Sequence, residues 1–201
     1  IVQSFKVDET GIKFENIVPK KVETSEKKEP KSLKLGKGIT RGLSFSPDGK
    51  FLAVSIIKDN KVSVFSTNTF TKVFEKVYED YPNQVQFSPD GKYLAVGCGN
   101  GYVYMYDVSS NFREMSNKYS SKGWVAPVAF SQDARYFAFG GAGYFAVFEL
   151  NSEKKLFESF DESIQTISFS PSAEYIAVGS ENNKVKVFSI KGDLVKEFHN
   201  Y

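Results

Sequence analysis

The feature that most limits the fold of this 201-residue chain is a six-residue phrase that occurs four times. The copies begin at Phe45, Phe87, Phe130 and Phe169, which lie 42, 43 and 39 residues apart. The first two copies read Phe-Ser-Pro-Asp-Gly-Lys. Two further markers follow in every copy: an alanine between apolar residues, then an aromatic residue after an apolar alternation. The markers are Ala53, Ala95, Ala138 and Ala177, then Phe65, Tyr106, Phe148 and Phe188. This register predicts four copies of one structural unit.

Each unit is predicted to contain four β-strands joined by tight turns. Apolar and polar residues alternate before each phrase, as at Leu43 and Phe45, which is typical of a half-buried strand. The phrase itself is typical of a turn, because proline fixes φ and glycine tolerates positive φ. Four strands in about 40 to 45 residues are typical of a β-propeller blade, so an all-β fold with four blades is expected. The expected blades cover about residues 39–80, 81–124, 125–162 and 163–201, and their fourth strands are Lys72–Val77, Arg113–Lys118, Lys155–Phe160 and Leu194–Phe198.

From about residue 38 to residue 201 the pattern resembles the WD-repeat family, most specifically in Phe-Ser-Pro-Asp-Gly-Lys-x-Leu-Ala-Val of the first two units. The family's Gly-His pair is absent, and its Trp-Asp pair is approached only by Tyr106-Asp107. The serine that often follows the second strand remains only as Ser180. The family's buried Asp–His–Ser–Trp hydrogen-bond network therefore cannot form, and apolar packing is expected to hold the blades together.

The first 38 residues differ in character from the repeats. Residues 1–18 are predicted to form a hairpin of two strands, Val2–Val7 and Ile12–Val18, and residues 19–38 a Lys/Glu-rich loop with a short strand at Ser32–Leu35. These strands would make a partial N-terminal blade. His199 falls where a following repeat would begin. We therefore expect an incomplete ring or a fragment of a larger propeller, with half of a dimeric ring or a compact ring of four or five blades as alternatives.

The titratable residues favour a non-catalytic protein. The chain has one histidine, His199, and one cysteine, Cys98, about 100 residues apart, so no catalytic group, metal site or cofactor is predicted. Gly140–Gly143 connects two predicted strands, which favours a hairpin over a phosphate-binding loop. A lactonase-type propeller enzyme stays open as an alternative, because it shares the Ser-Pro-Asp-Gly-Lys hairpin and the phrase from Val7 to Gly11.

The expected partners are other proteins, held by a scaffold or adaptor within a multiprotein complex. The linkers between units carry aromatic and cationic residues, which are frequent interface anchors. The candidate partner-binding residues are Tyr78, Tyr81, Tyr119, Lys122 and Trp124. Self-association to complete a ring is a further expectation.

Neither nucleic acid nor a membrane is an expected partner. The net charge is only +2, and no apolar run reaches the ~20 residues that span a bilayer. Nucleic-acid association through the Lys-rich loop remains an alternative function. The single cysteine favours an intracellular protein, cytoplasmic or nuclear.

Overall fold

The structure is a computed structural model that describes residues 5–8, 11–14, 32, 35, 38–116, 119–160 and 163–199. The chain divides into two units, Ile1–Leu33 and Lys34–Tyr201. In the first unit β1 (Phe5–Asp8) pairs with β2 (Gly11–Phe14) in an antiparallel hairpin. The remaining parts of the predicted strands, and most of the Lys/Glu-rich loop, lie outside the described residues. Ser32 and Leu35 are described, and neither belongs to a strand.

The second unit contains four antiparallel sheets, each formed by consecutive strands, as the repeat predicted. Blade 1 comprises β3 (Thr40–Phe45), β4 (Phe51–Ile56), β5 (Lys61–Ser66) and β6 (Lys72–Val77). Blade 2 comprises β7 (Pro82–Phe87), β8 (Tyr93–Cys98), β9 (Tyr102–Asp107), β10 (Arg113–Glu114) and β11 (Tyr119–Ser120). Blade 3 comprises β12 (Val125–Phe130), β13 (Tyr136–Gly141), β14 (Tyr144–Glu149) and β15 (Lys155–Phe160). Blade 4 comprises β16 (Ile164–Phe169), β17 (Tyr175–Ser180), β18 (Lys184–Ser189) and β19 (Leu194–His199). The described residues form strands and turns but no helix.

The outer edge of blade 2 differs from the prediction of one strand at Arg113–Lys118. β10 has only two residues, and β11 pairs separately with β9, with Tyr119 opposite Val103. Tyr119 therefore belongs to the sheet and not to the linker that follows it.

The repeated phrase forms the turn between the first two strands of each blade. In blade 2 the Ser88 hydroxyl donates to the Asp90 carboxylate at 2.6 Å and accepts a hydrogen bond from the backbone N–H of Tyr93 at 2.9 Å. Asp90 also accepts from the backbone N–H of Lys92 at 3.1 Å. Gly91 has a φ of 73°, the left-handed conformation in which glycine lacks the steric penalty of a side chain. The same arrangement recurs at Ser46–Asp48 and Ser131–Asp133.

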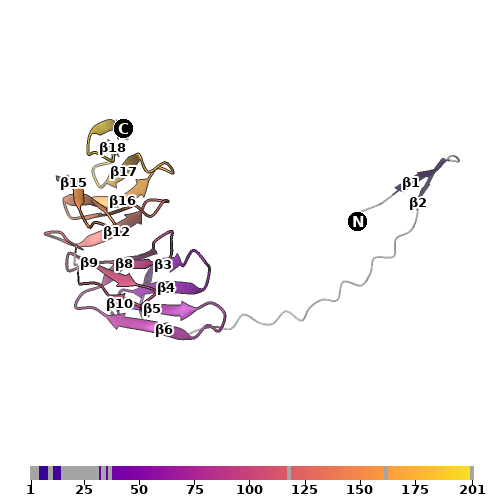
Figure 1. Cartoon of the computed structure of the whole chain (residues 1–201), viewed down its shortest axis with the longest axis horizontal. Helices are drawn as coiled ribbons and strands as arrows, with labels where there is room; N and C mark the ends of the chain where they lie inside the picture. The colour runs from indigo at the N-terminus through magenta and orange to yellow at the C-terminus, as the bar shows by residue number, and fades with distance from the viewer. Residues whose placement is uncertain are drawn as a thin grey trace. The chain divides into compact units, whose positions relative to one another are not determined.

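The blades pack face to face in chain order. Figure 1 shows the sheets following one another from β3–β6 at one end of this unit to β16–β19 at the other. We call the face of a blade that contacts the next blade its leading face, and the opposite one its trailing face. The leading faces of blades 1 to 3 bury Ala53, Val62, Val64, Ala95, Val103, Met105, Ala138, Phe145 and Val147. They meet trailing-face residues that include Val85, Phe87, Val128, Phe130, Ile176 and Val178. Apolar packing thus holds adjacent blades, as expected from the missing polar network.

The innermost strands lie side by side in the order β3, β7, β12 and β16. Polar side chains cross between them: the Ser44 hydroxyl accepts from the Phe87 N–H at 3.0 Å, and the Gln84 side-chain oxygen accepts from the Val128 N–H at 3.1 Å. Among the described residues, β3 and β16 share no packing comparable to that between these neighbouring strands. The four described blades therefore form an open arc and do not close into a ring.

Candidate protein-binding face

The antiparallel order of strands gathers two kinds of loop at one edge of every blade. The turn between the second and third strands and the linker to the next blade both lie there, because successive strands reverse direction. We call this edge the loop face. It contains the turns at 57–60, 99–101, 142–143 and 181–183 and the linkers at 78–81 and 121–124. Loops of this kind are positioned by a rigid scaffold, which suits them to binding.

Two of the five candidate partner-binding residues, Tyr78 and Tyr119, are buried. Tyr78 is buried between blades 1 and 2, where its phenol donates a hydrogen bond to the Tyr106 hydroxyl at 2.9 Å. Tyr119 is buried in blade 2, with its aromatic side chain 4.8 Å from that of Phe148 between centroids. Burial raises the pKa of Tyr119 to about 12. Both side chains belong to the core and not to an accessible surface.

Tyr81 lies in a groove of about 330 Å³ that we call the Tyr81 groove. Its other lining residues are Ile39, Arg41, Ile57 and Lys58. Tyr81 and Ile39 are exposed large side chains, and the groove combines them with two cationic residues. An exposed apolar surface beside a guanidinium and an ammonium suits a partner with an apolar and an acidic residue.

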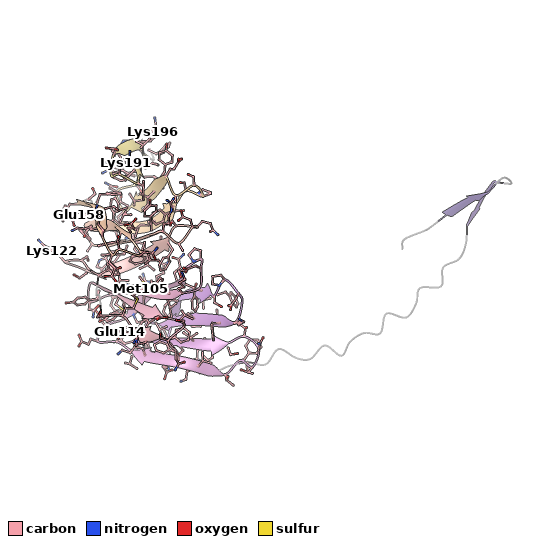
Figure 2. The ribbon with its side chains drawn as sticks, viewed as in Figure 1. Met105, Glu114, Lys122, Glu158, Lys191 and Lys196 are labelled. Carbon is pink, nitrogen blue, oxygen red and sulfur yellow. The ribbon has the colours of Figure 1, made fainter. Side chains whose placement is uncertain are left out.

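Lys122 lies in a second pocket of about 320 Å³, which we call the Lys122 pocket. Lys122 and Ser121 come from the linker after β11, Tyr144 from the start of β14, and Glu158 and Phe160 from β15. Phe160 is 70% exposed although it is a large apolar residue. Figure 2 shows Lys122 and Glu158 on the same side of the blades.

Hydrogen bonds hold the polar wall of the Lys122 pocket. The Tyr144 hydroxyl donates to the Glu158 carboxylate at 2.9 Å, and the Lys155 ammonium donates to the same oxygen at 2.7 Å. The hydrogen bond from Lys155, together with that from Tyr144, lowers the pKa of Glu158. The aromatic side chains of Tyr144 and Phe160 have centroids 5.5 Å apart. The wall therefore presents the Glu158 carboxylate beside the exposed Phe160 and the half-buried Tyr144.

Trp124 contributes a backbone hydrogen bond to the loop face. The Trp124 side chain is half-buried, and its carbonyl accepts from the Ala142 N–H at 3.1 Å. Trp124 is not among the residues that line the Lys122 pocket. Partner binding by Tyr81, Lys122 and Trp124 remains a prediction. Sequence reasoning did not identify Tyr144 and Phe160, because both occupy ordinary apolar positions of strands, on the face of blade 3 that packs against blade 2.

Three features of the described blades bear on catalytic and metal chemistry. Cys98 is buried, and this burial raises the pKa of its thiol. Among residues 38–116, 119–160 and 163–199 no group of three His, Cys, Asp or Glu side chains could hold a metal ion. A hollow of about 500 Å³ beside the inner strands is lined by Gln84, Gln86, Gln132 and apolar or hydroxyl neighbours, without an ionisable group. No helix in the part of the chain that the structure describes could cross a membrane.

Comparison with known families completes this description. The family model of eukaryotic translation initiation factor eIF2A matches residues 21–142, more than half of the chain. The chain belongs to the eIF2A family. The model of the WD domain, G-beta repeat, matches residues 152–189, which contain β15 to β18 in full in this family member. A comparison with curated proteins gave no match. The WD-repeat resemblance seen in the sequence is thus confirmed.

Proposed function

We propose that this chain is a non-catalytic protein-binding module that works in translation initiation. The role in translation initiation is inferred from the description of the matching family, a translation initiation factor. The observation that carries the binding role is the loop face, where the Tyr81 groove and the Lys122 pocket lie among loops held by rigid blades. A catalytic role has no comparable support among the described residues.

The chemistry of the two sites supports a partner segment that carries both apolar and acidic residues. The exposed Phe160 and Tyr81 offer apolar area, and each lies in a site that also contains a cationic side chain, Lys122 or Arg41. A few aromatic and cationic anchors commonly supply most of the affinity of a protein interface. Glu158 is already bound by Tyr144 and Lys155, so Lys122 is the cation of the pocket that would pair with the partner.

The test is a quantitative pull-down from a translationally active extract with the full chain as bait. We expect protein initiation factors to be enriched on the wild-type chain. A Lys122→Glu/Phe160→Ala variant should bind them about 30-fold more weakly, because loss of anchor residues costs ~2 kcal/mol or more. Lys191→Glu is the matched charge reversal, since Lys191 lies in the turn between β18 and β19, at the opposite edge of its sheet.

Two results would overturn the proposal. One is equal recovery of every initiation component by the wild type and the Lys122→Glu/Phe160→Ala variant. The other is complete loss of recovery after nuclease treatment, which would favour nucleic-acid association instead. Circular dichroism of each variant shows whether the blades are still folded.

A further inference from the structure

The first residue of the third strand pairs with the outer edge of its own blade in all four blades. Three blades hold at most one aromatic residue in this cross-strand pair: Lys61–Val77, Tyr102–Ser120 and Lys184–His199. Blade 3 alone among the described blades has two aromatic residues there, Tyr144 and Phe160. The other three blades form antiparallel sheets without such a pair. The fold therefore does not require aromatic residues at these two positions.

Tyr144 replaces a lysine and keeps the contact that the lysine makes. In blade 1 Lys61 forms an ion pair of 3.4 Å with Glu75, two residues before its cross-strand partner, and the corresponding lysine of blade 4 does the same. In blade 3 the Tyr144 hydroxyl donates to the equivalent carboxylate, Glu158, at 2.9 Å. This hydrogen bond restricts rotation of the Tyr144 side chain. A site that is already ordered loses less entropy when a partner binds.

Phe160 is the exposed end of a row of aromatic side chains that begins in the packing between blades 2 and 3. The centroids are 6.2 Å apart for Tyr119 and Phe139, and 6.0 Å apart for Phe139 and Tyr144. Those of Tyr144 and Phe160 are 5.5 Å apart. Tyr119 and Phe139 are buried, whereas Phe160 is 70% exposed. One more ring placed on Phe160 would continue the row at the ~4.5–7 Å spacing that aromatic pairs favour.

Lys122 adds a positive charge beside this row. The backbone of its linker is held in place, since the Ser121 N–H donates to the Gly101 carbonyl at 2.8 Å and the Ser121 hydroxyl donates to the Gly123 carbonyl at 2.6 Å. The Lys122 side chain is exposed and forms no ion pair with another described residue. Its ammonium is therefore available for a charge-assisted hydrogen bond to a carboxylate of a partner.

The size and charge of the Lys122 pocket favour a protein side chain over a nucleobase. Its volume of about 320 Å³ lies near the lower end of the ~300–1,000 Å³ range of ligand pockets, which suits a single large side chain. The described residues that line it include one cation, Lys122, and one carboxylate, Glu158. Single-stranded nucleic acids are bound where stacking aromatic residues lie in a positively charged groove that follows the phosphates. One lysine beside a carboxylate does not form such a groove.

We propose that the Lys122 pocket binds an aromatic side chain of the partner, and that an adjacent aspartate or glutamate of the same segment pairs with Lys122. The aromatic ring of the partner packs on Phe160 and continues the row from Tyr144. This inference rests on the proposed function and specifies the partner segment of that site as aromatic and acidic.

The test is an NMR titration of the full, ¹⁵N-labelled chain with capped pentapeptides. The reference probe is acetyl-Gly-Asp-Trp-Asp-Gly-amide. Leucine replaces tryptophan in a second probe, and asparagine replaces both aspartates in a third. We expect the reference probe to shift the amide signals of Lys122, Gly143 and Phe160, and to bind about tenfold more tightly than either of the other two.

An exchange between blades provides a variant that should keep its fold. Tyr144→Lys/Phe160→Val installs in blade 3 the pair found in blade 1, with a lysine that can bond to Glu158. This variant should keep the wild-type circular dichroism and bind the reference probe about tenfold more weakly or worse. Lys122→Gln should remove the preference for aspartate over asparagine and retain that for tryptophan over leucine. Val77→Ala, which changes the exposed counterpart of Phe160 in blade 1, is the matched control and should bind as the wild type does.

Four results would overturn the inference. They are equal affinity for the tryptophan and leucine probes, unchanged binding by Tyr144→Lys/Phe160→Val, no shift of the three amides at the highest peptide concentration, and tighter binding of a uridine oligonucleotide at the same amides. The pull-down of initiation factors tests the proposed function separately. Loss of those factors from the Lys122→Glu/Phe160→Ala bait, together with equal peptide affinities, would keep the proposed function and remove only the aromatic specificity.

Discussion

The phenol of Tyr78 donates a hydrogen bond of 2.9 Å to the hydroxyl oxygen of Tyr106 inside the packing between blades 1 and 2. Tyr78 comes directly after β6, and Tyr106 lies in β9, so this polar contact joins two blades. Tyr106 belongs to the dipeptide Tyr106-Asp107, which resembles the family's Trp-Asp pair more than the matching positions of the other units do. Burial raises the pKa of both tyrosines, so the bond is between two neutral phenols.

Removing one of these hydroxyls should be more harmful than removing both. Tyr78→Phe or Tyr106→Phe leaves a buried phenol without its partner and should lower the free energy of unfolding by about 1–3 kcal/mol. The double variant should be closer to wild type, because no unpaired hydroxyl remains. Urea denaturation of all four proteins measures this coupling, with Tyr102→Phe, an exposed position, as the control. Wild-type stability of both single variants would contradict the prediction.

Gly141 should not tolerate even a methyl group. A Cβ at this position would lie 1.8 Å from the carbonyl oxygen of Trp124, a backbone atom fixed by its bond from Ala142. Gly141→Ala is expected to lower the free energy of unfolding by about 2 kcal/mol or more. In Gly179→Ala the nearest atom is a side-chain methyl of Thr166, which can move, so a smaller loss is expected. Thermal or urea unfolding compares the two, and equal losses would contradict the steric explanation.

The turn of blade 4 lacks the carboxylate that the other three turns share. Ser172 stands at the position of Asp90, and Glu174 at the position of Lys92. Ser172→Asp/Glu174→Lys should restore the Ser–Asp–Lys arrangement and stabilise blade 4 by about 0.5–1 kcal/mol. Hydrogen exchange at the Tyr175 amide, which bonds to the Ser170 hydroxyl at 3.1 Å, reports on this turn directly. Glu174→Lys alone should change little, and unchanged exchange in the double variant would contradict the prediction.

Acid should weaken blade 1 through Glu75. The hydrogen bond from Lys72, followed by that from Ser63, lowers the pKa of Glu75 from 4.5 to about 2. A carboxyl whose pKa is lower in the folded state stabilises the protein above its unfolded pKa, and this contribution is lost as the pH falls through the folded value. The urea midpoint should therefore drop between pH 4.5 and 2. Glu75→Gln should flatten part of this decline and Ser63→Ala a smaller part, whereas identical profiles for all three proteins would exclude Glu75 as a contributor.

Local residue pattern predicted the strands well and the exposure of single side chains less well. The markers at Phe87 and Phe130 were placed on inner strands, and the structure buries them there. Tyr119 was assigned to a linker because it directly follows the predicted fourth strand, Arg113–Lys118. Its pairing with Val103 of β9 is a contact that no short-range pattern describes. Tyr78 looked like a surface residue of a linker because its partner, Tyr106, is distant in the sequence.

The sequence by itself determined the repeated unit: four blades, their turns and the apolar character of both faces follow from residues close together in the chain. Only the tertiary structure decided which copies of that unit are covered. Phe45 and Phe87 have the same local sequence, yet one is exposed and the other buried, because burial depends on whether another blade packs against the face. The grooves beside Tyr81 and Lys122 arise in the same way, since they exist only where loops from different strands meet.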